Sequence, residues 1–125
     1  MAEFEGIDHI DIVVKDPDAM AEFLLRLGFA MVRRAPPSRG SIELRFPGGE
    51  GQPVIELTPA HSPSGKEVPL GLRHMAIRSS DSSVTHAMLS EQGFSLSGAP
   101  RKVADTGRTV FSVIDPEGNP LQITD

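Results

Sequence analysis

Apolar and polar residues alternate along two separate stretches of the chain, and apolar residues at helical spacing follow each stretch. Within residues 7–14, Ile10, Ile12 and Val14 recur at every second position, and within 72–78 Met75 and Ile77 do the same, a period typical of a β-strand with one buried face. An aspartate that can begin a helix comes after each stretch, and a glycine that can end a helix comes further on. These residues are Asp16, Asp81, Gly28 and Gly93. The pattern predicts a strand followed by a short helix, twice.

Each predicted helix has one apolar side, which we expect to be buried. This side consists of Met20, Phe23, Leu24 and Leu27 in the first helix, and of Val84, Ala87 and Met88 in the second. Three shorter strands are expected after each helix, separated by turns rich in glycine and proline. Their ranges are 29–34, 41–46 and 54–58 after the first helix, and 94–97, 109–114 and 121–124 after the second.

The two stretches belong to two copies of one module. When the chain is shifted by 65 residues, seven identical residues coincide within residues 6–29. They are Gly6, His9, Ile12, Asp16, Leu24, Gly28 and Phe29, which match Gly71, His74, Ile77, Asp81, Leu89, Gly93 and Phe94. The sequence therefore predicts an α+β fold of two tandem βαβββ modules in a single domain, residues 1–125. Module one spans 5–58, module two spans 71–125, and a linker rich in proline, serine and glycine spans 59–70.

Four polar residues occupy matching places in the two modules. His9 and His74 lie in the first strands, and Glu56 and Gln122 lie in the closing strands between apolar neighbours. Because side chains alternate along a strand, we expect all four to point away from the side that packs under the helices. A lone strand histidine is usually a surface or hydrogen-bonded residue. Two histidines, each matched with an oxygen-bearing side chain, favour instead a site for a divalent ion such as nickel, cobalt, zinc, manganese or iron.

Composition narrows the function classes. The chain has 125 residues, a net charge of −5, no cysteine and no tyrosine. Thiolate and phenol chemistry are therefore excluded, and the scattered basic residues argue against a nucleic acid partner. An acidic start without an apolar stretch argues against a signal peptide, and no apolar run is long enough to span a membrane. We expect a cytoplasmic protein with no membrane partner.

At this point the sequence resembles the vicinal oxygen chelate superfamily, which includes glyoxalase I, methylmalonyl-CoA epimerase, extradiol dioxygenases and bleomycin resistance proteins. The segments that carry the resemblance are 8–10, 27–29, 54–57, 73–77 and 115–122. The resemblance implies a curled mixed β-sheet around a metal-binding cavity, with His9, Glu56, His74 and Gln122 as ligands. It also implies a homodimer, in which each cavity takes ligands from both chains. A site formed within one chain stays open as the second arrangement.

The ligand pattern is closest to those of glyoxalase I and methylmalonyl-CoA epimerase, but Gln122 stands where most metal-binding relatives carry glutamate. The resemblance implies a lyase or isomerase that removes a proton next to a metal-chelated carbonyl of a small substrate with vicinal oxygens. A glutamine amide is not a useful base. The predicted base is therefore Glu56, with Glu43 as the second candidate. The alternative to a catalytic role is that Glu43 is a solvated residue on the strand surface that pairs with Arg45.

Three other functions stay open. One is an extradiol dioxygenase with His9, His74 and Glu56 as a two-histidine, one-carboxylate set. The others are a metal-free drug-binding protein and a fosfomycin-type transferase. Basic residues that could hold a substrate anion are Arg78, Arg101, Lys102 and Arg108, and we expect His61 and His86 to be solvent-exposed.

Overall fold

A computed structural model describes residues 4–61, 63, 65 and 67–125. Residues 1–3 and three positions of the predicted linker, 62, 64 and 66, lie outside the described residues. The strands are β1 (Phe4–Val14), β2 (Ala30–Arg34), β3 (Ile42–Arg45), β4 (Val54–Pro59), β5 (Gly71–Ser79), β6 (Arg101–Lys102), β7 (Thr109–Ile114) and β8 (Pro120–Thr124). The helices are α1 (Pro17–Arg26) and α2 (Ser82–Glu91).

The strands form one mixed sheet in the order β2-β3-β4-β1-β5-β8-β7-β6. The β1–β4 and β5–β8 pairs are parallel, and the pairs formed by β2 with β3, β3 with β4, β6 with β7 and β7 with β8 are antiparallel. The α+β class and the mixed sheet are thus as predicted. The cavity stays a prediction. None of the helices in the described ranges is long and apolar enough to cross a membrane.

The chain divides into two compact units. The first unit is His9–Arg73, and the second consists of the described residues up to Asp8 together with His74–Asp125. Strands β1 and β5 each contribute residues to both units. The single-domain interpretation and the module boundaries stay predictions.

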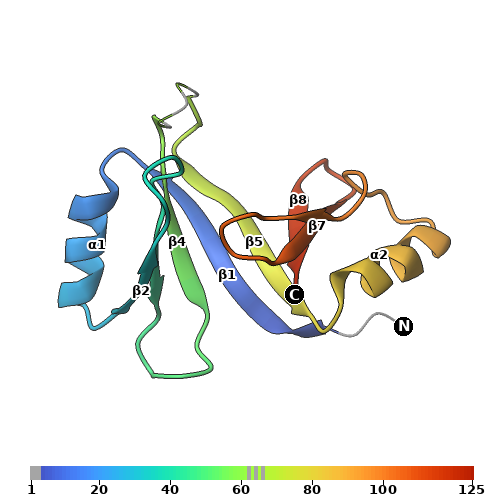
Figure 1. Cartoon of the computed structure of the whole chain (residues 1–125), viewed down its shortest axis with the longest axis horizontal. Helices are drawn as coiled ribbons and strands as arrows, with labels where there is room; N and C mark the ends of the chain where they lie inside the picture. Colours follow the sequence, from blue (N-terminus) through green and yellow to red (C-terminus); the bar gives the residue numbers. More distant parts are fainter. Residues whose placement is uncertain (1–3, 62, 64, 66) are drawn as a thin grey trace. The chain divides into compact units, whose positions relative to one another are not determined.

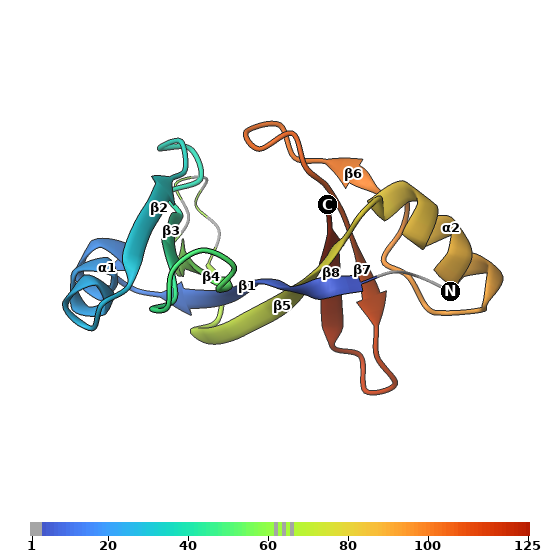
Figure 2. The same ribbon diagram turned by 90° about the horizontal axis from the view of Figure 1, so that it is seen from below.

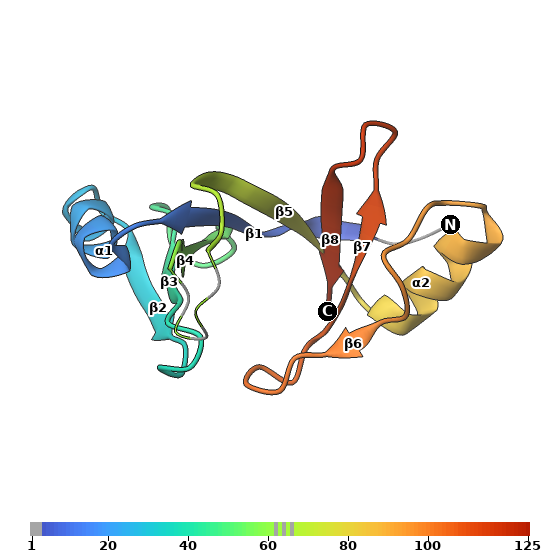
Figure 3. The ribbon, with the colours of Figure 1, turned by 90° about the horizontal axis from the view of Figure 1, so that it is seen from above.

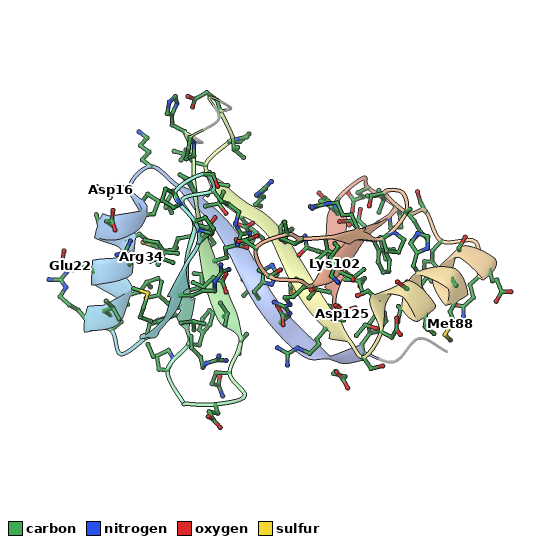
Figure 4. All side chains as sticks on the ribbon, in the orientation of Figure 1. Asp16, Glu22, Arg34, Met88, Lys102 and Asp125 are labelled. Carbon is green, nitrogen blue, oxygen red and sulfur yellow. The ribbon has the colours of Figure 1, made fainter. Side chains whose placement is uncertain are left out.

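In the first unit, α1 packs on the apolar side of the sheet, beside β3 and β4 (Figure 1). Its N-cap is Asp16, whose Oδ1 accepts a hydrogen bond from the Ala19 N–H over 3.0 Å. Figure 4 shows Asp16 at the start of α1. After the helix, the chain turns at Gly28, whose φ of 100° favours glycine. The buried core residues are Ala21, Leu24, Ile42, Leu44, Ile55 and Leu57.

The second unit repeats this arrangement. Asp81 caps α2 by accepting from the Val84 N–H over 3.1 Å, and α2 packs beside β7. Strands β7 and β8 run side by side as an antiparallel pair (Figure 3). The core of this unit is smaller, formed by Leu89, Phe111 and Ile123. In β3, β4 and β8 the buried core residues alternate with polar ones, as the sequence pattern predicts, whereas in β7 Phe111 follows the equally buried Val110.

The buried sides of both helices differ in part from the prediction, although Leu24 is buried and Met20 packs against the core as expected. In α1, Ala21 and Leu24 are buried, whereas Phe23 and Leu27 are exposed. In α2, the buried residues are Ser82, Thr85 and Leu89, whereas the Val84 residue is 55% exposed and Ala87 is also exposed. In both helices one leucine and smaller residues form the buried side, which is therefore not the most apolar side of the helix.

The predicted strand at 94–97 is wrong. Leu96 forms an isolated bridge to Val113, and the Ser97 N–H and the Ser95 carbonyl oxygen bond to Ser112 and Ile114 of β7 over 2.9 Å each. The Ser112 N–H donates to the Ser97 hydroxyl, also over 2.9 Å, so the ladder is not continued by backbone groups at this position. The two-residue β6, which also pairs with β7 (Figure 2), lies within a segment expected to be a loop.

Candidate functional site

His9 and Glu56 lie together in the first unit. Strand β1 runs parallel to β4, with Asp11 opposite Glu56 and His9 two residues earlier. The His9 Nε2 atom is 3.7 Å from Glu56 Oε1, and both side chains are only 12% exposed. Since Ile55 and Leu57 belong to the core under α1, Glu56 lies on the opposite face of the sheet.

Glu43 lies next to Glu56 on the neighbouring strand. The two residues are direct partners in the β3–β4 ladder, and the Glu43 side chain is 18% exposed. It forms an ion pair with Arg33 over 2.9 Å and approaches Arg39 at 3.8 Å. Arg39 also donates to Glu56 over 3.3 Å. Two carboxylates therefore share one polar face with His9.

The expected pairing of Glu43 with Arg45 is wrong. The Arg45 Nη1 atom donates to the backbone oxygen of Gln52 over 3.0 Å. Arg33 takes its place because β2 contains a bulge between Met31 and Arg33, which puts Arg33 directly opposite Glu43. A bulge adds one residue to one strand, so simple alternation does not predict it.

Burial raises the pKa of Glu56 above its ordinary value, and the nearby charge of Asp11 raises it further. The interactions with His9 and Arg39 lower the pKa of Glu56, and Glu43 adds a smaller upward contribution. Burial therefore favours the protonated form of Glu56.

Two buried aspartates were not among the predicted site residues. Asp11 accepts a hydrogen bond from Thr58 Oγ1 over 2.6 Å and lies 3.4 Å from Arg73 Nη1. Asp11 lies two residues after His9 and so on the same face of the strand, and this spacing could have identified Asp11 as a site residue. Asp8 pairs with Arg78 and Arg108 in the second unit, and alternation gives no hint of this pairing.

His74 and Gln122 belong to the second unit. Strand β5 runs parallel to β8, with Ala76 opposite Gln122 and His74 two residues earlier. This register repeats that of His9 and Glu56, so the repeat read from the sequence is also a repeat of strand pairing. Both side chains are partly buried. The four predicted ligands are divided equally between the two units.

The donor atoms of the first unit fit a divalent metal ion. Two ligands of one tetrahedral ion, each about 2.1 Å from it, are separated by about 3.4 Å, close to the 3.7 Å between His9 and Glu56. Within the described ranges, no three side chains of His, Cys, Asp or Glu gather in one place to hold an ion by themselves. His9 and Glu56 therefore form a pair that needs further ligands.

The other predicted residues have different surroundings. The expectation of a solvent-exposed His86 is wrong, because its ring packs edge-on against Phe111 at 4.9 Å and Nε2 lies 2.7 Å from the Gly98 carbonyl oxygen. His61 is exposed and pairs with Glu67. Arg101 and Lys102 form the exposed β6.

The family model described as Glyoxalase/Bleomycin resistance protein/Dioxygenase superfamily matches residues 6–123, so the chain belongs to this family. The resemblance read from the sequence is confirmed. A search of curated proteins found none that matches the chain.

Solved structures share the fold. A variant of the Streptomyces coelicolor methylmalonyl-CoA epimerase, in complex with 2-nitronate-propionyl-CoA, is 21% identical with a TM-score of 0.76, covering 98% of this chain and 97% of that one. The Mycobacterium tuberculosis methylmalonyl-CoA epimerase is 21% identical with a TM-score of 0.77, covering 99% and 89%. A hypothetical protein from Bacillus halodurans is 21% identical with a TM-score of 0.66, covering 94% and 91%.

Proposed function

We propose that this protein is a divalent-metal-dependent isomerase of the epimerase type, which moves a proton next to the carbonyl of a small substrate with two neighbouring oxygens. The observation that carries the proposal is the pair of carboxylates, Glu43 and Glu56, side by side with His9 on the polar face of the first unit. Family membership and the epimerase fold support the same reaction class. Lyase chemistry of the glyoxalase type begins with the same proton transfer.

The proposed metal ligands are His9, Glu56, His74 and Gln122. A bound divalent ion would stabilise the negative charge that develops on the substrate oxygens when the proton leaves. Because the ligands come from two units, the complete site forms either in one chain or between the two chains of a homodimer.

Glu43 is the proposed proton acceptor, and Glu56 is the second candidate. Glu43 is not one of the four proposed ligands, so it would not have to leave the ion in order to accept a proton, as Glu56 would. The ion pair with Arg33 fixes the Glu43 carboxylate on this face. Glu43 therefore combines the position and the chemistry of a general base.

The first experiment measures hydrogen exchange in deuterated water, by NMR, with metal-loaded protein. Methylmalonyl-CoA is the first compound to test, because a solved epimerase of this fold is described in complex with it. We expect deuterium at the carbon between the two carbonyls. Glu43→Gln should slow this exchange at least 100-fold without loss of bound metal, whereas Glu56→Gln should lose both. Glu50→Gln, an exposed change in the turn after β3, is the matched control.

Three outcomes would contradict parts of the proposal. Unchanged exchange in Glu43→Gln removes Glu43 as the base. Absence of exchange in methylmalonyl-CoA and in a series of other carbonyl compounds removes the epimerase reaction. Metal-dependent oxygen uptake with a catechol would favour the dioxygenase instead.

The arrangement of the site is tested by mixing variants. His9→Ala and His74→Ala should each lower metal affinity more than tenfold. If sites are shared between chains, co-expression of the two variants creates mixed dimers in which one of the two sites keeps both histidines. Metal binding then partly returns. If each site lies within one chain, the mixture binds as poorly as either variant.

A further inference from the structure

A buried carboxylate in the second unit holds two arginines. Asp8 is buried in β1, and its Oδ1 atom accepts from Arg78 Nε over 3.1 Å and from Arg78 Nη2 over 2.7 Å. Arg108 Nη2 donates to the same oxygen, and Arg108 Nε donates to the backbone oxygen of Asp125 over 2.8 Å. Figure 4 labels Asp125, the residue that follows β8. Both guanidinium groups are thus fixed in orientation.

Both arginines belong to the sheet face that carries His74 and Gln122. Along β5, His74, Ala76 and Arg78 alternate with Met75 and Ile77. Arg78 is opposite Thr124 in β8, two residues after Gln122, and Thr124 is opposite Val110 in β7. Arg108 is two residues before Val110, so it continues the same face. The core residues Phe111 and Ile123 lie on the other face, under α2.

Both arginines of the cluster remain accessible. The Arg78 side chain is 53% exposed and that of Arg108 is 33% exposed. The carboxylate of Asp125 accepts the backbone N–H groups of Ser82 and Thr109. Asp8 binds the Nε and Nη2 atoms of Arg78 and the Nη2 atom of Arg108. A guanidinium has five N–H donors in a planar fork that matches a phosphate or carboxylate.

We propose that Arg78 and Arg108, oriented by Asp8, form a binding site for an oxyanion carried by the substrate, a phosphate or a carboxylate group. This proposal adds a substrate-binding site to the proposed function. It rests on the proposed function in one respect, namely that the bound ligand is the substrate of the enzyme. Arg78 follows His74 by four residues, and a strand rises about 3.3 Å per residue. The site therefore selects substrates with an anionic group roughly 13 Å along the strand from the chelating oxygens.

The test measures binding of inorganic pyrophosphate and, separately, succinate by isothermal titration calorimetry at low ionic strength. The protein is stripped of metal, because pyrophosphate binds metal ions. We expect Arg78→Gln to weaken binding at least fivefold and Arg78→Lys to weaken it less, since lysine keeps the charge but not the fork. Arg101→Gln removes the same charge from exposed β6 of the same unit and should change affinity less than twofold.

Each outcome decides the proposal. Binding of pyrophosphate alone assigns the site to phosphate-bearing substrates, and binding of succinate alone assigns it to carboxylates. The proposal is overturned if neither probe binds, or if Arg101→Gln weakens binding as much as Arg78→Gln does. Arg108 still pairs with Asp8 in the Arg78 variants, and their melting temperatures show whether the unit stays folded. Since the titration needs neither metal nor turnover, its failure leaves the epimerase proposal intact, and failure of hydrogen exchange leaves the anion site intact.

Discussion

A buried hydrogen bond joins the two strands that carry His9 and Glu56. Thr58 follows Glu56 by two residues, Asp11 follows His9 by two, and the Thr58 hydroxyl donates to Asp11 over 2.6 Å. Thr58→Val keeps the shape of the side chain and removes the donor. We expect this change to destabilise the protein, because the Asp11 carboxylate stays buried with one donor fewer.

The magnitude follows from the kind of hydrogen bond. A hydrogen bond to a charged group contributes roughly 1.5–3 kcal/mol. Valine and threonine have similar volumes, so no cavity adds to the loss. Thr58→Val should therefore lower the free energy of unfolding by about 1.5–3 kcal/mol, which lowers the melting temperature by about 5–12 °C in a chain of this size.

Urea denaturation of metal-free protein at neutral pH measures this loss. Thr58→Ser is the matched control, because it keeps the hydroxyl and removes one methyl group, which costs about 0.8 kcal/mol. The denaturant dependence should stay unchanged, so that the midpoint alone reports stability. If Thr58→Val is as stable as Thr58→Ser, the hydrogen bond to Asp11 does not stabilise the fold as we argue.

Three further predictions concern stability and pH. Burial and the charge of Asp11 raise the pKa of Glu56. At a pH between the ordinary and the raised pKa, Glu56 is therefore protonated in the folded metal-free protein and ionised in the unfolded chain. Stability should fall as pH rises through that interval, and urea midpoints of Glu56→Gln should lack this fall. Leu57 is fully buried in the first core, so Leu57→Ala should cost about 2–5 kcal/mol by urea denaturation; a loss below that of Thr58→Ser would contradict the packing. Asp16→Ala removes the N-cap of α1 and should cost about 1 kcal/mol, while Glu22→Ala on the exposed side of α1 should leave the thermal midpoint nearly unchanged.

The local signals in the sequence were sufficient for several elements. Asp16 and Asp81 cap their helices because a short carboxylate satisfies the first free N–H groups wherever the chain allows a helix. The alternation that puts Ile55 and Leu57 in the core puts Glu56 on the other face, since side chains alternate in any strand. These features depend on neighbours within a few residues.

Other features needed the partner strand. Arg45 lies two residues from Glu43 on the same strand, and only the β2 bulge decides that Arg33 is the partner. Val84 is as apolar as Leu89, but contact with the sheet buries Leu89 alone. The segment 94–97 likewise depends on β7, with which it forms one isolated bridge, from Leu96 to Val113, rather than a full ladder.

The sequence by itself therefore determined the repeated strand–helix pattern, the helix ends and the face of the sheet on which each polar residue lies, because these depend on local spacing and backbone chemistry. Only the tertiary structure decided the partners of the charged groups. Asp8 and Arg108 are 100 residues apart in the chain, and the pairing of a buried charge depends on which strands the fold brings together.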